Sequence, residues 1–379
     1  MNNILVIFNN AKSIQYIFDA ILKLSIDNNI YYYLNHQMSL KFLSNKLYPD
    51  SNNDIRVSLI NTLNINKCIN IGDELNNLKI FLENTKLDIA IIDDSNGIHK
   101  GNRHGYNEIY SIIKKMNNIP IVGCIEGIKN FNKNEKKKTE LQSIVNSVNI
   151  CYDYIFCFSK YQYNHLKENK LLENKIFKVG IPYLDKLNKL NIYTEKDKEY
   201  IIFFSSWSPN LNKTKWKSID EDYIKVIIQL AKEMELKLII KEKPRNNYSY
   251  KHLESDNVIV TMCEGNELDT LMTKSKLVIS VPSTIILRCL FLNIPTIILN
   301  DEYYGQLGGL KDFKGVLNNS INLNSIKEKY IFFKKNKNYI QNYLKDNYYG
   351  IEFNSINLFI NNINNIILNN EMENRNNSK

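Results

Sequence analysis

One apolar stretch, LVISVPSTIILRCLFLNIPTIILN over Leu277–Asn300, limits the possible fold more than any other part of the chain. Its first run, Leu277–Val281, has the length of a buried strand and ends at Pro282, which cannot donate to a sheet ladder. The pattern then predicts a helix that begins near Ser283 and a second strand over Thr296–Leu299. A strand, a helix and a strand within about two dozen residues predict one parallel βαβ unit.

The turn between the first strand and the helix carries two hydroxyls, Ser283 and Thr284. Serine and threonine are favoured helix N-caps, and free N–H groups at a helix N-terminus attract anions. Taken alone, this serine is more often a cap than a ligand contact, so the phosphate site that we predict here depends on the neighbouring loops. Asn293 suits the helix C-terminus, because asparagine tolerates a left-handed conformation.

The length and composition are those of a soluble globular protein with more than one domain. The chain has 379 residues, of which 44% are hydrophobic and 23% charged, and this is long for a single core. The net charge of +9 suits phosphate-bearing ligands or an anionic membrane surface, and no nucleic-acid-binding motif accompanies it. We therefore expect no nucleic-acid partner.

Cysteine usage and hydropathy indicate the compartment. The six cysteines form no C-x-x-C pair, which favours buried thiols in a reducing environment. The first residues lack the basic region of a signal peptide, and no apolar stretch approaches the length of a transmembrane helix. These features predict a cytoplasmic protein, with contact at the inner face of a membrane left open.

Short apolar runs alternate with helical patterns along the chain, which predicts an α/β fold with doubly wound parallel sheets. The alternation stops over the polar stretch Asn188–Lys198, where we place a domain boundary. We expect Rossmann-like domains over residues 1–190 and 191–350, facing a cleft, and a helix with a disordered tail over 351–379. Besides those above, the expected strands are Ile4–Phe8, Tyr31–Leu34, Ile89–Ile92, Ile121–Cys124, Tyr154–Phe158, Ile176–Val179, Tyr200–Phe204, Leu236–Lys241 and Val258–Thr261.

Capping patterns predict where three helices begin. Ser159 follows a strand and is expected to cap the next helix. The S-x-x-E patterns that start at Ser218 and Ser325 predict capping boxes at two further helices.

Two loops that follow strands carry charged groups suited to catalysis. Glu126, next to Gly127, is suited to act as a general base at a strand end. Lys243 and Arg245 flank a proline and are placed to neutralise a diphosphate or a leaving phosphate. In isolation, Glu126 is better explained as a surface residue in a turn, and Lys243 and Arg245 are explained equally well as a solvated basic turn.

Two further loops carry candidate contacts. Ser205, Ser206 and Trp207 follow a strand, and the tryptophan either stacks on a base or sugar or packs in the core. The loop after Ile89–Ile92 carries side chains that could shape an acceptor site: Asp93, Asp94, His99, Arg103 and His104. Their spacing matches no metal-binding pattern. The absence of G-x-S-x-G, G-x-x-x-x-G-K-[ST] and G-x-G-x-x-G argues against nucleophilic triads, P-loop ATPases and NAD enzymes.

These loops, in this order, resemble GT-B-fold transferases of bacterial surface glycans. Val179–Leu187 is similar to the G-x-P-x-x-D-x-L run before the second domain of CDP-glycerol glycerophosphotransferases. Phe203–Trp207 looks like the opening of their donor domain, and Leu277–Leu299 resembles their serine-bearing strand and helix. Bacterial sialyltransferases carry acidic-Gly, His-Pro and Ser-Ser/Thr motifs, and Glu126-Gly127, Pro244-Arg245 and Ser283-Thr284 lie in the corresponding places.

The chain departs from both groups at two positions. The glycerophosphotransferases have His-Gly in place of Glu126-Gly127, and both groups have a histidine near Lys243, where this chain has Arg245. A mechanism based on histidines at these positions is therefore excluded. Glu126 would serve as the base and Arg245 would take the electrostatic part, although the same changes fit a different donor or a loss of activity.

The resemblance implies a metal-independent GT-B glycosyltransferase without a cofactor. It would move a sugar from a nucleotide donor of the CMP, CDP, UDP or GDP type to a capsule, LPS or teichoic-acid type of glycan, free or lipid-linked. It assigns catalysis to Glu126 and Arg245, donor binding to Lys243, Ser283, Thr284, Ser205, Ser206 and Trp207, and the acceptor side to Asp94, His99, Arg103 and His104.

Three alternatives stay open. They are transfer of glycerol phosphate or another polyol phosphate from a CDP donor, a non-hydrolysing sugar-nucleotide epimerase, and a non-catalytic binding protein of the same fold. The donor base, the sugar, the linkage, the stereochemistry and the oligomeric state are not determined by the sequence.

Overall fold

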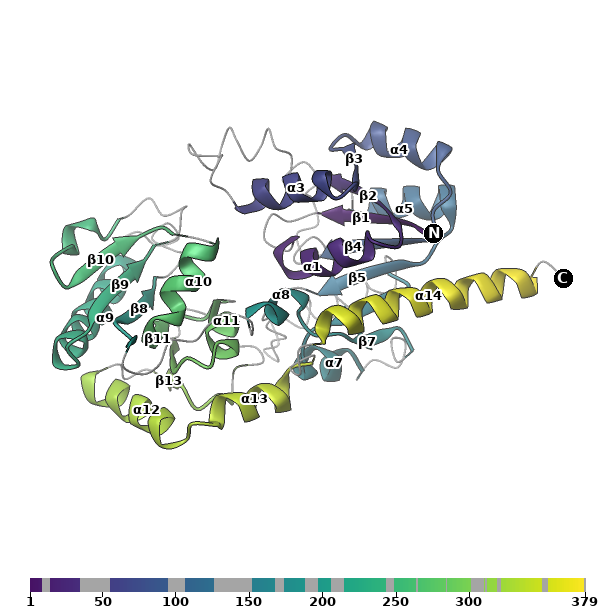
Figure 1. Ribbon diagram of the computed structural model, residues 1–379. Helices are drawn as coiled ribbons and strands as arrows, with labels where there is room; N and C mark the ends of the chain where they lie inside the picture. The colour runs from purple at the N-terminus through teal and green to yellow at the C-terminus, as the bar shows by residue number, and fades with distance from the viewer. Residues whose placement is uncertain are drawn as a thin grey trace. The chain divides into compact units, whose positions relative to one another are not determined.

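The chain folds as two parallel α/β units (Figure 1). Unit 1 comprises Met1–Lys186 and Asn347–Lys379, and unit 2 comprises Leu187–Asp346. The computed structural model describes residues 1–8, 14–34, 55–94, 106–125, 152–167, 174–187, 197–205, 215–242, 249–263, 265–283, 285–300, 310, 312–318, 322–349 and 354–377.

Unit 1 contains a seven-stranded parallel sheet with the order β3-β2-β1-β4-β5-β6-β7. The strand order reverses between β1 and β4, so a topological switch point lies there. The strands are β1 Asn3–Phe8, β2 Asn29–Leu34, β3 Ile69–Gly72, β4 Ile89–Asp94, β5 Ile121–Ile125, β6 Tyr154–Cys157 and β7 Ile176–Lys178. The helices are α1 Ile14–Leu24, α3 Ile55–Ile65, α4 Leu75–Asn84, α5 Tyr106–Asn117, α7 Lys160–Lys167, α8 Pro182–Asp185 and α14 Ser355–Asn377.

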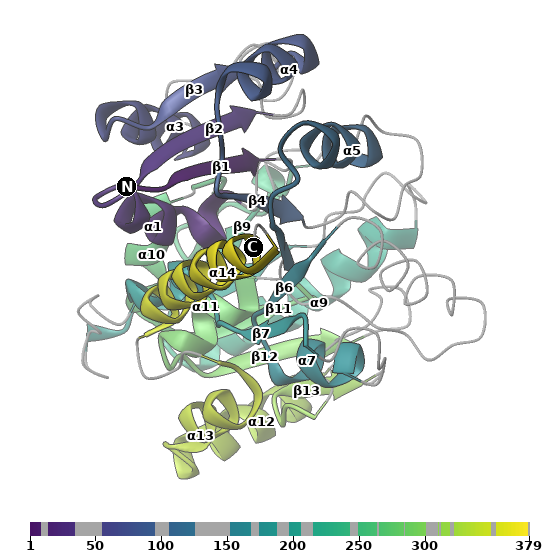
Figure 2. The same ribbon diagram turned by 90° about the vertical axis from the view of Figure 1, so that its right-hand side faces the viewer.

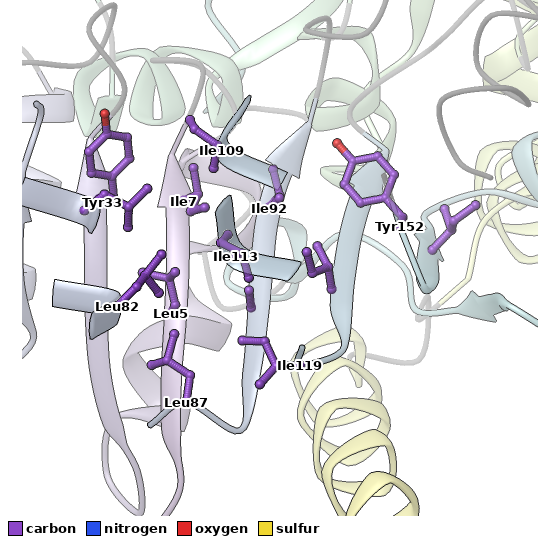
Figure 3. Close-up of a cluster of buried hydrophobic side chains, with 14 of the residues drawn as sticks. Leu5, Ile7, Tyr33, Leu82, Leu87, Ile92, Ile109, Ile113, Ile119 and Tyr152 are labelled. Atoms are coloured by element: carbon purple, nitrogen blue, oxygen red, sulfur yellow. The ribbon is translucent and has the colours of Figure 1, made fainter. Parts of the chain in front are cut away.

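One hydrophobic core of unit 1 lies between the sheet and helices α4 and α5 (Figure 3). Strand side chains point alternately to the two faces, and Leu5, Ile7 and Ile92 point to this one. Ile109 and Ile113 of α5 pack against them, since their spacing of four residues places both on one face of the helix.

Unit 2 contains a six-stranded parallel sheet with the order β10-β9-β8-β11-β12-β13, so its switch point lies between β8 and β11. The strands are β8 Tyr200–Phe204, β9 Lys237–Lys241, β10 Val258–Thr261, β11 Ser275–Ser280, β12 Thr296–Asn300 and β13 Val316–Asn318. The helices are α9 Lys215–Glu233, the 3-10 helix η7 Lys251–Leu253, α10 Gly265–Thr273, α11 Ile285–Phe291, α12 Leu323–Lys335 and α13 Tyr339–Asn347.

The predicted parallel α/β fold and its central βαβ unit are confirmed. β11 and β12 pair in parallel, and α11 connects them. Asn293 ends the helix in a left-handed conformation with φ of 54°. The N–H of Ile294 donates to the Cys289 carbonyl at 3.0 Å and that of Asn293 to the Leu290 carbonyl at 2.8 Å. This pair of bonds is the Schellman motif, which satisfies carbonyls at the helix end.

The capping predictions have mixed outcomes. Ser159 does cap α7, because its Oγ accepts from the N–H of Gln162 at 3.2 Å. The start at Ser218 is wrong, since α9 begins at Lys215 and the serine lies inside the helix. The start at Ser325 is also wrong. Asn322 is the N-cap of α12, its side chain accepts from the Ser325 N–H, and Ser325 occupies the third helical position of this capping box.

The C-terminal helix α14 returns to unit 1 and packs on α1 and α8. It continues to Asn377, so most of the disordered tail expected within residues 351–379 is helical. Two residues of the G-x-P-x-x-D run contact the returning segment. The Asp185 carboxylate accepts from the Ile356 N–H at 2.9 Å, in the first turn of α14. Gly180, with φ of +83°, leaves room for the Tyr349 carbonyl. These contacts give Gly180 and Asp185 of the run a structural role in unit 1.

Protonation of Asp185 should make the stability of unit 1 depend on pH. Burial raises the pKa of this carboxyl, although hydrogen bonds from Ile356 and Ser355 lower it. The folded state therefore binds the proton more readily than the unfolded chain, so its free energy of unfolding gains from this group as pH falls through the raised pKa. Asp185→Asn keeps an oxygen acceptor but does not titrate. Urea denaturation at about pH 7 and about pH 5 should show the wild type gaining stability relative to the variant at the lower pH. An unchanged difference would contradict the assignment.

Candidate functional site

The switch point of unit 2 brings two of the predicted loops together. β8 and β11 are hydrogen-bonded neighbours, and Phe204 at the end of β8 pairs with Ser280 at the end of β11. Ser205 and the Val281–Ser283 turn therefore leave the carboxyl edge of the sheet side by side. Open α/β sheets bind ligands at this place, so these two loops define the candidate site.

Ser205 links the ends of two neighbouring strands. It is only 1% exposed, and both its N–H and its hydroxyl donate to the Lys241 carbonyl at 3.2 Å. These bonds hold the end of β8 against the end of β9. The observed contacts of Ser205 are therefore structural. Its contact with a donor stays a prediction.

Ser283 has a different environment from the serines around it. Its side chain is partly exposed, and its carbonyl accepts from the Ile286 N–H at 3.2 Å in the first turn of α11. Ser280, three residues earlier, is fully buried and donates from its Oγ to the Val281 carbonyl at 2.7 Å. Of these two hydroxyls, that of Ser283 is therefore the more accessible to a ligand.

A buried carboxylate at the end of β9 was given no role by the sequence. Glu242 is 4% exposed, its side chain accepts from the Tyr250 N–H, and its own N–H donates to the Thr261 carbonyl at 2.8 Å. These bonds fix the end of β9 immediately before Lys243. In the sequence, Glu242 is marked only by its place at the end of a strand. A charged residue at such a place is normally expected to be exposed to solvent.

The helix behind the turn is held by a buried ion pair. Arg288 of α11 bonds Asp269 of α10, and their side chains are 14% and 7% exposed. Cys289 and Met272 place their sulfur atoms 3.7 Å apart in the same interface. These contacts join α10 to α11, the helix that follows the turn at Ser283.

The switch point of unit 1 carries two carboxylic residues. Asp93 is 1% exposed and pairs with Phe8 of β1, so it lies where the strand order reverses. Asp94 ends β4 and pairs with Ile125, the last residue of β5. Glu126 follows Ile125 in the sequence, and a parallel sheet brings the ends of such neighbouring strands to one edge.

Most of the other candidates lie outside the described residues. Within the part of the chain that the structure describes, no three His, Cys, Asp or Glu side chains could hold a metal ion. Nor does any described helix combine the length and apolar character that crossing a bilayer requires. The candidates outside the described residues are Glu126, Lys243, Arg245, Thr284, Ser206, Trp207, His99, Arg103 and His104.

The two parallel α/β units and their sheet orders define a GT-B-like architecture. No protein-family model matches the chain, and no curated protein is similar to it in sequence. Three solved structures carry the comparison. The glycotransferase of kitacinnamycin has a TM-score of 0.62 at 7% identity, covering 97% of this chain and 99% of the other.

The second is the UDP-GlcNAc 2-epimerase from Neisseria meningitidis bound to UDP-GlcNAc, with a TM-score of 0.60 at 14% identity, covering 95% of this chain and 99% of that one. The third is the wall teichoic acid polymerase TagF, with a TM-score of 0.56 at 13% identity, covering 97% of this chain and 89% of that one. Identities this low show a shared fold alone.

Proposed function

We propose that the protein is a metal-independent glycosyltransferase that moves a sugar from a nucleotide donor to a cell-surface glycan, free or lipid-linked. The observation that carries the proposal is the partly exposed Ser283 at the switch point of unit 2, where open α/β sheets bind ligands. The fold shared with a glycotransferase and with an epimerase bound to UDP-GlcNAc adds support. The donor would bind within residues 191–350 and the acceptor within 1–190, in the cytoplasm.

In this proposal the donor phosphate is held by hydroxyls and cations. Ser283 and Thr284 donate to its oxygens, and Lys243 and Arg245 stabilise the charge on the leaving nucleotide. Trp207 stacks on the base or sugar, with Ser206 beside it. Ser205 acts through its bonds to Lys241, which hold the ends of β8 and β9 together.

The transfer step needs one base and no oxidant or metal. An acceptor hydroxyl oxygen attacks the anomeric carbon while Glu126 takes its proton. The bond between that carbon and the phosphate oxygen breaks, and the nucleotide leaves with the electron pair. Asp94, His99, Arg103 and His104 would orient the acceptor.

Transfer of a polyol phosphate is the second candidate, because TagF, a wall teichoic acid polymerase, shares the fold over 97% of this chain. Product analysis separates the two, since only polyol-phosphate transfer adds phosphorus to the acceptor. The epimerase similarity supports a third candidate, which needs no acceptor. Incubation with the donor alone identifies that reaction.

Ser283→Ala should weaken nucleotide binding by about 10- to 100-fold, because a hydrogen bond to a charged group contributes about 1.5–3 kcal/mol. The measurement is thermal shift with CMP, CDP, UDP and GDP, with and without EDTA. One nucleotide should raise the melting temperature of the wild type regardless of EDTA, since ligands that bind only the folded state stabilise it.

Ser280→Ala is the matched control. It removes a buried hydroxyl three residues earlier, at the end of β11, so it should lower stability and leave nucleotide affinity unchanged. Equal losses of affinity in both variants, or no stabilisation of the wild type by any nucleotide, would contradict the phosphate site.

A further inference from the structure

The turn between α12 and α13 forms a basic hollow on unit 2. Both helices lie beside β13, at the edge of the sheet (Figures 1 and 2). The hollow has a volume of about 490 Å³ and contains neither a catalytic nor a donor-binding candidate. It is lined by Lys335, Asn336, Lys337, Asn338, Tyr339 and Asn342.

An aromatic cluster supports the hollow from inside. Phe313, Phe333 and Tyr343 are at least 93% buried, and Tyr339 joins them with ring centroids 5.7–6.2 Å away. The Tyr339 hydroxyl accepts from the Lys314 N–H at 2.7 Å, which fixes this ring at the edge of the hollow. The lysine and asparagine side chains therefore project from a rigid base.

The surface around the hollow is positive overall, although the Asp312 carboxylate lies near Tyr339. Residues 323–346 contain six lysines and two acidic residues, a net +4 of the chain's +9. Lys334, Lys335 and Lys337 are exposed, and no carboxylate among the described residues forms an ion pair with them. By contrast, Lys327 nearer the start of α12 pairs with Glu233 of α9. The positive charge at the turn is thus left to face solvent.

An exposed apolar side chain lies within this positive surface. Ile331 is 47% exposed and precedes Lys335 by four residues, so both occupy one face of α12. Lysines beside an exposed apolar side chain suit a membrane interface, where the charges contact anionic lipids and the apolar group leaves water. A soluble anion would gain binding free energy from the lysines but none from Ile331.

We propose that the α12–α13 surface, defined by Ile331, Lys334, Lys335, Lys337 and the hollow, docks on an anionic lipid membrane. Ile331 enters the boundary between headgroups and acyl chains. The three lysines contact lipid phosphates, and one headgroup phosphate occupies the hollow between Lys335 and Lys337. The inference is independent of the proposed reaction, and its test requires no substrate.

The test is sedimentation of the full chain with vesicles of phosphatidylcholine, with or without phosphatidylglycerol. The wild type should bind only the anionic vesicles, and less as salt rises. The triple charge reversal K334E/K335E/K337E should weaken this binding at least ~100-fold, because each lysine near the surface contributes and each reversal adds repulsion. Ile331→Ser should weaken it by about tenfold, including at high salt where charge effects are screened.

The control K232E/K237E/K251E changes the net charge equally, at exposed positions of the same unit. It should lose less than about tenfold, because surface charge acts within a Debye length. Three results would overturn the proposal: no binding of the wild type to anionic vesicles, equal losses in the two triple variants, or displacement from the vesicles by millimolar inorganic phosphate, which would indicate a site for a free anion.

Discussion

Gly180→Ala is expected to lower the free energy of unfolding by about 3 kcal/mol or more. Gly180 has φ of +83°, a conformation that costs alanine roughly 1 kcal/mol. A Cβ there would lie 2.4 Å from the Tyr349 carbonyl oxygen and 2.6 Å from the Ser355 Oγ. The Ser355 Oγ can rotate away, but the Tyr349 carbonyl is a backbone atom, so the chain at Tyr349 would have to shift. Such a shift would weaken the packing of the returning segment on unit 1, where α14 contacts α1 and α8. Chemical denaturation followed by circular dichroism measures the effect.

Gly72→Ala separates backbone strain from the contact with the returning chain. Gly72 also has a positive φ, of +104°, but its Cβ would meet only the Asn77 Nδ2 at 3.0 Å. That atom is the end of a flexible side chain, so the variant should lose only about 1 kcal/mol. Equal losses of unfolding free energy at Gly180 and Gly72 would contradict the inference that Gly180 is needed for the packing of the segment that contains α14.

Buried strands with apolar runs were predictable because their signal is local. β8 and β10 have the predicted bounds, and the βαβ unit from β11 to β12 formed where the pattern placed it. No element was predicted between Arg56 and Ile89, where α3, β3 and α4 lie. β3 is an edge strand with exposed residues, so it shows no apolar run. The S-x-x-E pattern failed twice because it also occurs inside helices.

The position of candidate site residues was more predictable than their contacts. Ser205 does follow β8 as predicted, but its bonds go to Lys241, which is 36 residues away. Likewise, Gly180 and Asp185 belong to a run identified by resemblance, and their contacts are with Tyr349 and Ile356. Such contacts depend on how distant segments pack, and no local pattern encodes them.

Glu126→Gln should reduce sugar transfer by about 10²- to 10⁴-fold, the usual contribution of a general base. Glutamine has nearly the same shape and cannot accept the acceptor proton. Nucleotide affinity should stay unchanged, because the donor phosphate is assigned to Ser283 and Thr284 on unit 2. The control is Glu83→Gln, which makes the same change at an exposed position on α4 of unit 1.

Release of nucleotide from CMP-, CDP-, UDP- and GDP-activated donors tests the proposed activity most directly, with EDTA present and a bacterial surface-glycan fraction as acceptor. The account predicts that the wild type and Glu83→Gln release one nucleotide at equal rates, in proportion to the acceptor, and that Glu126→Gln binds this nucleotide but releases almost none. Release by Glu126→Gln at the wild-type rate would contradict the base assignment. Nucleotide binding by the wild type without release from any donor would contradict the proposed transferase.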